Sequence, residues 1–135
     1  MTYVPLHLHS IYSPFEGMIT FPELVSRISF LKIPAVAITD HWTTYGHYEF
    51  YKLAREAGIK PILGMEAYLT EDVKIKSVEK RYYHILLLVQ NATGYKNLCK
   101  LISYSYQKGF YFKPRIDYAA LEKHSEGLIT MSACL

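Results

Sequence analysis

The sequence has little of several features that usually identify a class of protein. Only two of its 135 residues are cysteines, Cys99 and Cys134, so a disulfide-stabilised secreted domain is not expected. The charges nearly balance, and a net charge of +3 does not by itself indicate a nucleic-acid partner. The longest apolar run, residues 85–89, is far too short to cross a membrane, and no leader precedes the first predicted strand. We expect a cytoplasmic protein with no membrane partner, whose thiols are free to bind metal.

Half of the residues are hydrophobic, which is enough for a folded core. Thr20 and Glu23 have the spacing of a capping box, and Pro34 ends the helix that they begin. Short apolar runs alternate with stretches of helical periodicity along the rest of the chain. The expected helices lie at about 21–31, 46–57, 92–106 and 118–121. The expected strands lie at 3–10, at 35–38, at 59–63 with a continuation across Gly64 to 66–69, at 84–89 and at 128–131.

This alternation of strands and helices predicts an α/β fold with a parallel sheet. A doubly wound sheet would carry its site in one or two loops, whereas a (β/α) barrel collects residues from the ends of several strands. Polar residues near the end of nearly every strand favour the barrel. Only about five strands fit into 135 residues, and a full barrel needs roughly 250. We therefore expect the N-terminal part of a longer domain.

Two imidazoles lie two residues apart in the first predicted strand. Side chains alternate along a strand, so His7 and His9 are expected on the same face. A histidine pair of this kind is more often packing than a metal site, unless other ligands accompany it. Such residues do recur, because Asp40-His41, Glu66, His84 and Cys134 all lie near the ends of apolar runs.

Each of these residues also has a simpler interpretation. Asp40 and His41 could cap the next helix, Glu66 could be an exposed strand end, and Cys134 could be a small buried hydrophobe. His84 begins its apolar run, although ligands are expected where a barrel strand ends. His47 and His124 are expected at the surface, and Cys99 in a helix core.

Taken in order, these motifs resemble the polymerase and histidinol phosphatase (PHP) family. Within it, the chain is similar to the N-terminal segment of bacterial replicative DNA polymerases of the polymerase III alpha type. That narrower resemblance depends on residues 57–64, 91–98 and 109–117, followed by 125–129, and it covers essentially the whole chain.

The resemblance implies a distorted seven-stranded, TIM-like (β/α) barrel with up to three zinc or manganese ions. Asp40 corresponds to a residue that orients an imidazole, and Glu16 stands where these polymerases usually have aspartate. The family's last ligands, an Asp and a His, would lie beyond Leu135. The residues at metal-ligand positions are His7, His9, Glu16, His41, Glu66, His84 and Cys134.

The function implied is DNA replication, with 3′ to 5′ exonuclease-like phosphoester hydrolysis at a metal cluster in which Asp40 and Glu66 are the catalytic residues. DNA and other replicase subunits would be the partners. Two alternatives remain: a platform that braces the polymerase without catalysis, and a free-standing PHP phosphatase such as histidinol phosphatase. The 135-residue piece alone is expected to be inactive and to associate with itself through open sheet edges.

Overall fold

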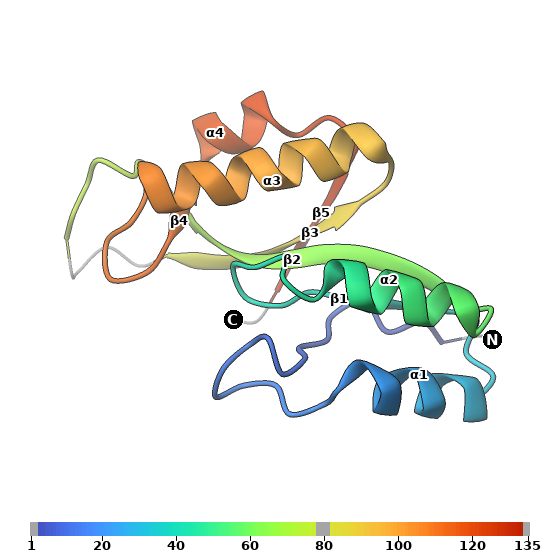
Figure 1. Ribbon diagram of the computed structural model, residues 1–135. Helices are drawn as coiled ribbons and strands as arrows, with labels where there is room; N and C mark the ends of the chain where they lie inside the picture. The colour runs from blue at the N-terminus through green and yellow to red at the C-terminus, as the bar shows by residue number, and fades with distance from the viewer. Residues whose placement is uncertain (1–2, 78–81, 134–135) are drawn as a thin grey trace. The chain divides into compact units, whose positions relative to one another are not determined.

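The computed structural model describes residues 3–77 and 82–133, and its fold is mixed α/β (Figure 1). Five strands form one sheet in the order β1-β2-β3-β5, with β4 paired to β2. The chain divides after Met65 into two compact units, and β2 runs through the division. The elements are α1 (Phe21–Phe30), β1 (Ala35–Ile38), α2 (His47–Glu56), β2 (Lys60–Thr70), β3 (Tyr83–Val89), α3 (Ala92–Gln107), β4 (Arg115–Asp117), α4 (Tyr118–Lys123) and β5 (Leu128–Ser132).

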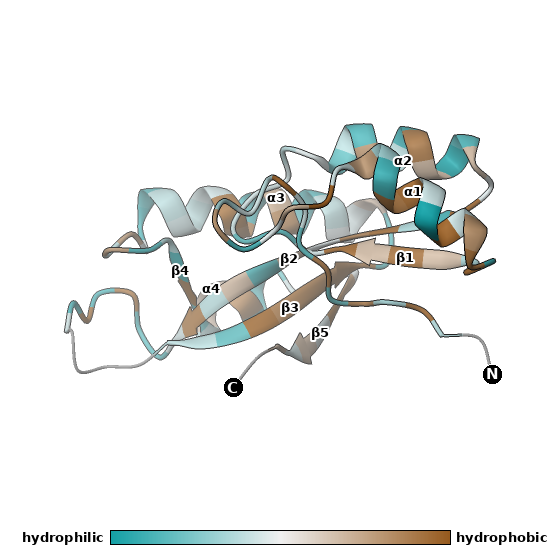
Figure 2. Cartoon of the chain, turned by 90° about the horizontal axis from the view of Figure 1, so that it is seen from below, coloured by the Kyte–Doolittle hydropathy of each residue, from teal (hydrophilic) through white to brown (hydrophobic). Residues whose placement is uncertain are grey.

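Helices α1 and α2 begin and end close to where the sequence predicts. At the start of α1, the Glu23 carboxylate accepts hydrogen bonds from the Thr20 backbone N–H (3.1 Å) and hydroxyl (2.6 Å). Both helices alternate hydrophobic and hydrophilic residues, as Figure 2 shows, because each packs only one side against the core. The buried core of the first unit comprises Phe21, Leu24, Ile28, Val36, Ile38, Phe50, Ala54 and Ile59.

The segment predicted as the first strand, residues 3–10, does not form a regular strand, although it is hydrogen-bonded to the β1 segment. The N–H groups of Ala37 and Thr39 in and after β1 donate to the carbonyls of Pro5 and Leu8, each at 2.9 Å. The two donors are two residues apart, whereas the two acceptors are three residues apart. The segment at residues 5–8 therefore has one additional residue opposite β1, as in a β-bulge. The prediction of a strand at residues 3–10 is therefore wrong, although this segment lies beside β1.

Strand β2 is one continuous strand of 11 residues that joins the two stretches expected on either side of Gly64. Gly64 lies within it and does not break it. Its first part pairs in parallel with β1, from Ala35 opposite Lys60 to Ile38 opposite Leu63. This pairing confirms the parallel arrangement predicted for the first unit.

In the second unit the expected parallel direction is wrong for β5, which pairs antiparallel with β3. Ile85 lies opposite Ser132 and Val89 opposite Leu128. The Ala133 N–H also donates to the His84 carbonyl at 3.2 Å. Strand direction depends on the path of the intervening chain, which hydrophobic periodicity does not specify. The antiparallel direction brings the end of β5 to the start of β3.

Asp117 joins several segments of the second unit and caps α4. Its carboxylate accepts hydrogen bonds from the Ala120 N–H (2.9 Å), the Tyr104 hydroxyl (3.0 Å) and the Val73 N–H (3.3 Å). Burial and, to a smaller extent, the hydrogen bond with Asp117 raise the pKa of Tyr104 to about 12. Val73 is buried, so the segment after Thr70 is anchored at this point.

The five-stranded α/β sheet agrees with the predicted fold class. Closure into a seven-stranded barrel stays a prediction. None of the helices in the described part of the chain is long and apolar enough to cross a membrane.

Candidate metal centre

Three potential metal ligands of the first unit lie around one point. The Glu16 Oε2 atom is 2.5 Å from His41 Nε2 and 3.6 Å from His9 Nδ1. One ligand atom from each of these residues lies within 4.8 Å of the other two. His7 adjoins the group, with its Nε2 atom 3.2 Å from the Nε2 atom of His9. Two imidazoles and a carboxylate at this separation could hold a divalent cation.

Glu16 reaches this cluster from a compact turn that follows the two histidines. The N–H groups of Ser13 and Gly17 donate to the carbonyls of Ser10 and Ser13, each at 2.9 Å. A Cβ atom on Gly17 would lie 2.0 Å from the Ser10 carbonyl oxygen. Only glycine therefore permits this close approach of the two backbones.

Asp40 is hydrogen-bonded to the same turn. Its carboxylate is 1% exposed and accepts hydrogen bonds from the Ser10 N–H (2.6 Å), the Ser10 hydroxyl (2.8 Å) and the Ser13 hydroxyl (2.7 Å). The Ser13 hydroxyl in turn accepts from the His41 N–H at 3.1 Å. Asp40 was expected to orient an imidazole, whereas these hydrogen bonds join the backbone segments that carry Glu16 and His41.

Two strained residues flank the ligands of the first unit. Phe15, directly before Glu16, has φ of 70°, and Trp42, directly after His41, has φ of 60°. Left-handed backbone is unfavourable for bulky side chains and is found mostly where the surrounding structure imposes it, often at functional sites. No glycine marks either position, so sequence reasoning did not identify this feature.

The second unit contains a separate pair of candidate ligands. Glu66 is fully buried in β2, and its Oε1 atom lies 2.6 Å from Nδ1 of His84. A buried carboxylate requires a hydrogen bond or a cation, and the imidazole supplies such a partner. The alternative that Glu66 is an exposed strand end is therefore wrong. His84 is the second residue of β3, at the beginning of its strand as the sequence indicated.

The structure thus brings His7, His9, Glu16 and His41 together in the first unit, and Glu66 and His84 together in the second. Cys134, the remaining predicted ligand, lies outside the described residues. Ser10 and Ser13 were missed as supporting residues. Their only signal in the sequence is the proximity of two small hydroxyl side chains to the histidine pair.

The remaining histidines do not belong to these groups. His47 was expected at the surface, which is wrong, because it is 2% exposed and its Nε2 atom lies 3.0 Å from the Gly64 carbonyl oxygen. Its spacing from Phe50 and Ala54 places it on the buried face of α2. Burial lowers the pKa of His47 and favours the neutral ring. His124, also expected at the surface, is half-buried.

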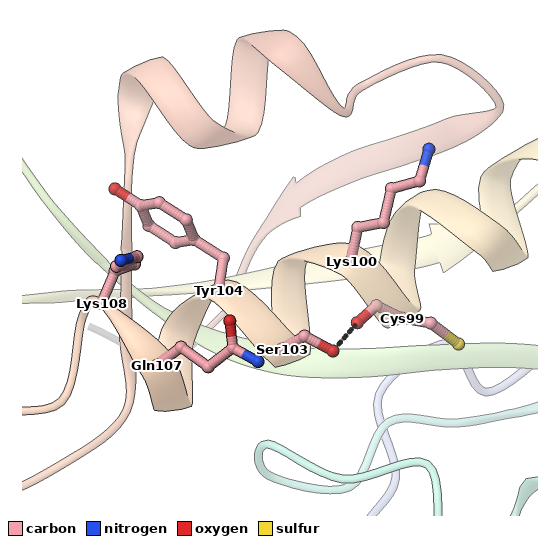
Figure 3. Close-up of a pocket in the computed structure, with 6 residues that line it drawn as sticks. All are labelled: Cys99, Lys100, Ser103, Tyr104, Gln107 and Lys108. Carbon is pink, nitrogen blue, oxygen red and sulfur yellow. Dashed lines mark hydrogen bonds between the residues drawn. The ribbon is translucent and has the colours of Figure 1, made fainter.

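A hollow on the surface of α3 has a different character. Its lining includes Cys99, Tyr104 and Lys108, and the Ser103 hydroxyl donates to the Cys99 carbonyl at 3.0 Å (Figure 3). Burial raises the pKa of the Cys99 thiol, which disfavours the reactive thiolate. This hollow therefore lacks the features of a metal or catalytic site.

Comparison with protein families identifies the family of the chain. The family model named PHP domain matches residues 5–135 of the sequence. The chain belongs to the PHP domain family. This PHP domain is 45% identical to DNA polymerase III subunit alpha of Borreliella burgdorferi and 45% identical to that of Aquifex aeolicus, in each case over 98% of the chain. It spans only 12% of the length of each polymerase. The PHP domain is therefore homologous to the N-terminal PHP region of these subunits.

Solved structures show the same type of fold. A candidate metal-dependent phosphoesterase from Bifidobacterium adolescentis superposes with a TM-score of 0.56 at 24% identity, a level that shows the fold alone. An amidohydrolase from Chromobacterium violaceum, solved with sulfate and without metal, has a TM-score of 0.56 at 26% identity. Each match covers 76% of the PHP domain and 32% of the solved chain.

Proposed function

We propose that this PHP domain is part of a DNA polymerase III alpha subunit, and that it binds divalent metal ions and supports hydrolysis of phosphoester bonds at DNA 3′ ends. The observation that carries the metal proposal is the convergence of His9, Glu16 and His41 on one point. The similarity to the polymerase subunits supports the role in replication.

The donor atoms suit the metals that the family resemblance implies. Imidazole nitrogens and carboxylate oxygens are ligands for zinc and manganese, and a thiolate such as Cys134 would favour zinc. His7 would contribute to the set around His9, Glu16 and His41. Glu66 and His84 form the second proposed set. The proposal includes up to three metal ions in the complete domain, and these ions are zinc or manganese.

The side chains of the domain have distinct proposed roles in hydrolysis. When bound, divalent cations lower the pKa of coordinated water and neutralise charge on the phosphoester oxygens. Asp40 positions Glu16 and His41 through the two serines. Glu66 contributes negative charge and holds the His84 ring by their short contact. We assign Asp40 a positioning role and Glu66 a catalytic one.

DNA and other replicase subunits are the proposed partners, and the bacterial cytoplasm is the proposed location. Both proposals follow from the resemblance to polymerase III alpha subunits. The two competing functions are the non-catalytic platform and the free-standing phosphatase, and they predict different results in the experiment below.

Metal content is the first measurement. The double substitution His7→Ala, His9→Ala should remove bound zinc or manganese, measured by elemental analysis after dialysis, because two ligands are lost from one group. His124→Ala is the matched control, since His124 is a half-buried histidine outside both ligand sets. Unchanged metal content in the double variant would contradict the proposed metal centre.

Hydrolysis is tested in the polymerase that contains this domain, with a single-stranded oligonucleotide labelled at its 5′ end. We expect loss of 3′ nucleotides that stops with chelator, returns with zinc or manganese, and is absent in Glu66→Gln while polymerisation continues. The amide keeps the size of the side chain and removes its charge. Metal binding without hydrolysis would support the platform. Hydrolysis of small phosphomonoesters, with the oligonucleotide left intact, would support the phosphatase.

A further inference from the structure

Two tyrosines pack beside His84 in the second unit, and a cation contacts both of them. The Lys113 ammonium donates a hydrogen bond to the Tyr68 hydroxyl at 2.8 Å and lies 4.4 Å from the centre of the Tyr68 ring. It also lies 5.3 Å from the centre of the Tyr82 ring. The rings of Tyr68 and Tyr82 stand 4.6 and 6.0 Å from the His84 ring. The Lys113 ammonium and the His84 ring therefore contact the same two tyrosine rings.

The backbone directs Lys113 into this group. Phe112, the preceding residue, has φ of 58°, and Tyr111 and Lys113 form an isolated antiparallel bridge. A bulky residue adopts left-handed backbone only when the surrounding structure compensates for the strain. The tight reversal at Phe112 thus fixes where the Lys113 side chain leaves the backbone.

Lys113 and nearby Arg115 bind different kinds of partner: Lys113 contacts phenols, whereas Arg115 contacts backbone carbonyls. Arg115 is 4% exposed, and its guanidinium donates to the backbone carbonyls of Gly109, Val73 and Ile75, so it supports the fold. The hydrogen bond with Tyr68 raises the pKa of Lys113, so the ammonium stays charged. An ammonium has three donors, so its contacts with the Tyr68 and Tyr82 phenols leave one for a further acceptor.

Tyr82 adds an exposed aromatic ring to the same group. Its side chain is 37% exposed, and its ring packs 4.5 Å from that of Tyr68. Aromatic rings beside a cation are the combination with which proteins bind single-stranded nucleic acid, because bases stack on the ring while the cation contacts phosphate.

We propose that Lys113 and Tyr82 form a nucleotide-binding subsite beside His84, in which the Lys113 ammonium binds a phosphate of single-stranded DNA and the Tyr82 ring stacks on a base. This inference rests on the proposed function, because it names the residues that present a DNA strand to the ligand pair Glu66 and His84. The recognition itself requires no metal.

The test measures binding of a short labelled oligothymidylate to the chain by fluorescence anisotropy, with chelator present and at several salt concentrations. Lys113→Gln should weaken binding several-fold at low salt and reduce the slope of log affinity against log salt by about 0.7, the value for one phosphate contact on a single strand. Lys113→Arg should restore most of the affinity. Lys108→Gln, which removes an exposed lysine at the end of α3, is the charge-matched control and should bind like the wild type.

Tyr82 is tested by substitution to leucine, with Tyr83→Leu as the control on the adjacent, 61% exposed residue. Tyr82→Leu should weaken binding at every salt concentration without changing the slope, since stacking involves no ion release. Thermal melts of all variants measure any effect on folding. A stabilising role alone would lower the melting temperature of Lys113→Gln and leave its salt slope unchanged.

Equal binding by Lys113→Gln and the wild type would overturn the subsite, as would equal losses in Lys113→Gln and Lys108→Gln. Either result leaves the metal proposal intact, because metal content is measured independently. Conversely, a slope change specific to Lys113 in a chain that binds no metal would support the subsite and contradict the proposed hydrolysis.

Discussion

The Ser13 hydroxyl donates to Asp40 at 2.7 Å and accepts from the backbone N–H of His41 at 3.1 Å. The Ser13 side chain thus links the Asp40 carboxylate to the backbone of His41, a candidate metal ligand. Its carboxylate also accepts from the Ser10 N–H and hydroxyl, so its charge is satisfied within the turn. Its proposed contribution to the site is to hold two ligand-bearing segments together.

Asp40→Asn should therefore weaken metal binding although every proposed ligand is retained. The amide nitrogen would face a donor of Ser10 or Ser13, and loss of a buried hydrogen bond to a charged group costs about 1.5–3 kcal/mol in the free energy of unfolding. Metal titration and urea unfolding measure the two effects. Ser13→Ala is the comparison and should give a smaller loss, since Ser10 still contacts the carboxylate. Wild-type metal affinity in Asp40→Asn would contradict the positioning role.

Gly17→Ala should reduce metal affinity by moving Glu16. The added Cβ atom would overlap the Ser10 carbonyl oxygen at 2.0 Å, so the turn must open. Gly58→Ala provides a control for general strain, because Gly58 has φ of 72° and open space around it. We expect both variants to lose stability and only Gly17→Ala to lose metal affinity, as measured by calorimetric titration. Equal metal affinities would argue against the importance of this turn.

The burial of His47 predicts a dependence of stability on pH. Burial lowers the pKa of His47 in the folded state below its usual 6.5, so the unfolded chain binds a proton at higher pH than the folded chain. The free energy of unfolding should therefore fall as pH decreases below about 6.5, and the contribution levels off below the folded pKa. Urea unfolding in chelator from about pH 7.5 to about pH 5.5 measures this slope. His47→Gln should reduce it; an unchanged slope would show that other groups cause it.

Strand β5 predicts self-association of the 135-residue chain. It lies at the end of the strand order, and Ile129 and Met131 are 47% and 36% exposed on it. An exposed apolar edge strand promotes pairing between chains. Light scattering should detect oligomers, and Ile129→Lys should shift the distribution towards monomer. A monodisperse wild-type monomer with a cooperative melt would refute this prediction.

Much of the local structure is encoded within short stretches of the sequence. The capping box at Thr20 and Glu23, the cap at Asp117 and the apolar run of β1 involve residues only a few positions apart. Such interactions depend on the backbone that they stabilise and little on the rest of the chain. For this reason the bounds of α1 and α2 could be predicted closely, and the identities of the candidate ligands could be read from their order.

Other features depend on residues far apart in the chain. The antiparallel pairing of β5 with β3, the burial of His47 against the Gly64 carbonyl and the partners of Asp40 all cross about 17 to 47 positions of sequence. Periodicity records which residues are apolar but not which distant segment covers them, so these features could not be predicted.

The sequence by itself determined the PHP family, the helices and the residues available as metal ligands. The tertiary structure decided which of those residues meet and which supporting residues hold them: His9, Glu16 and His41 around one point, Glu66 against His84, and Asp40 on two serines. The physical reason is that donor chemistry belongs to individual side chains, whereas the distance between donors depends on how the chain folds.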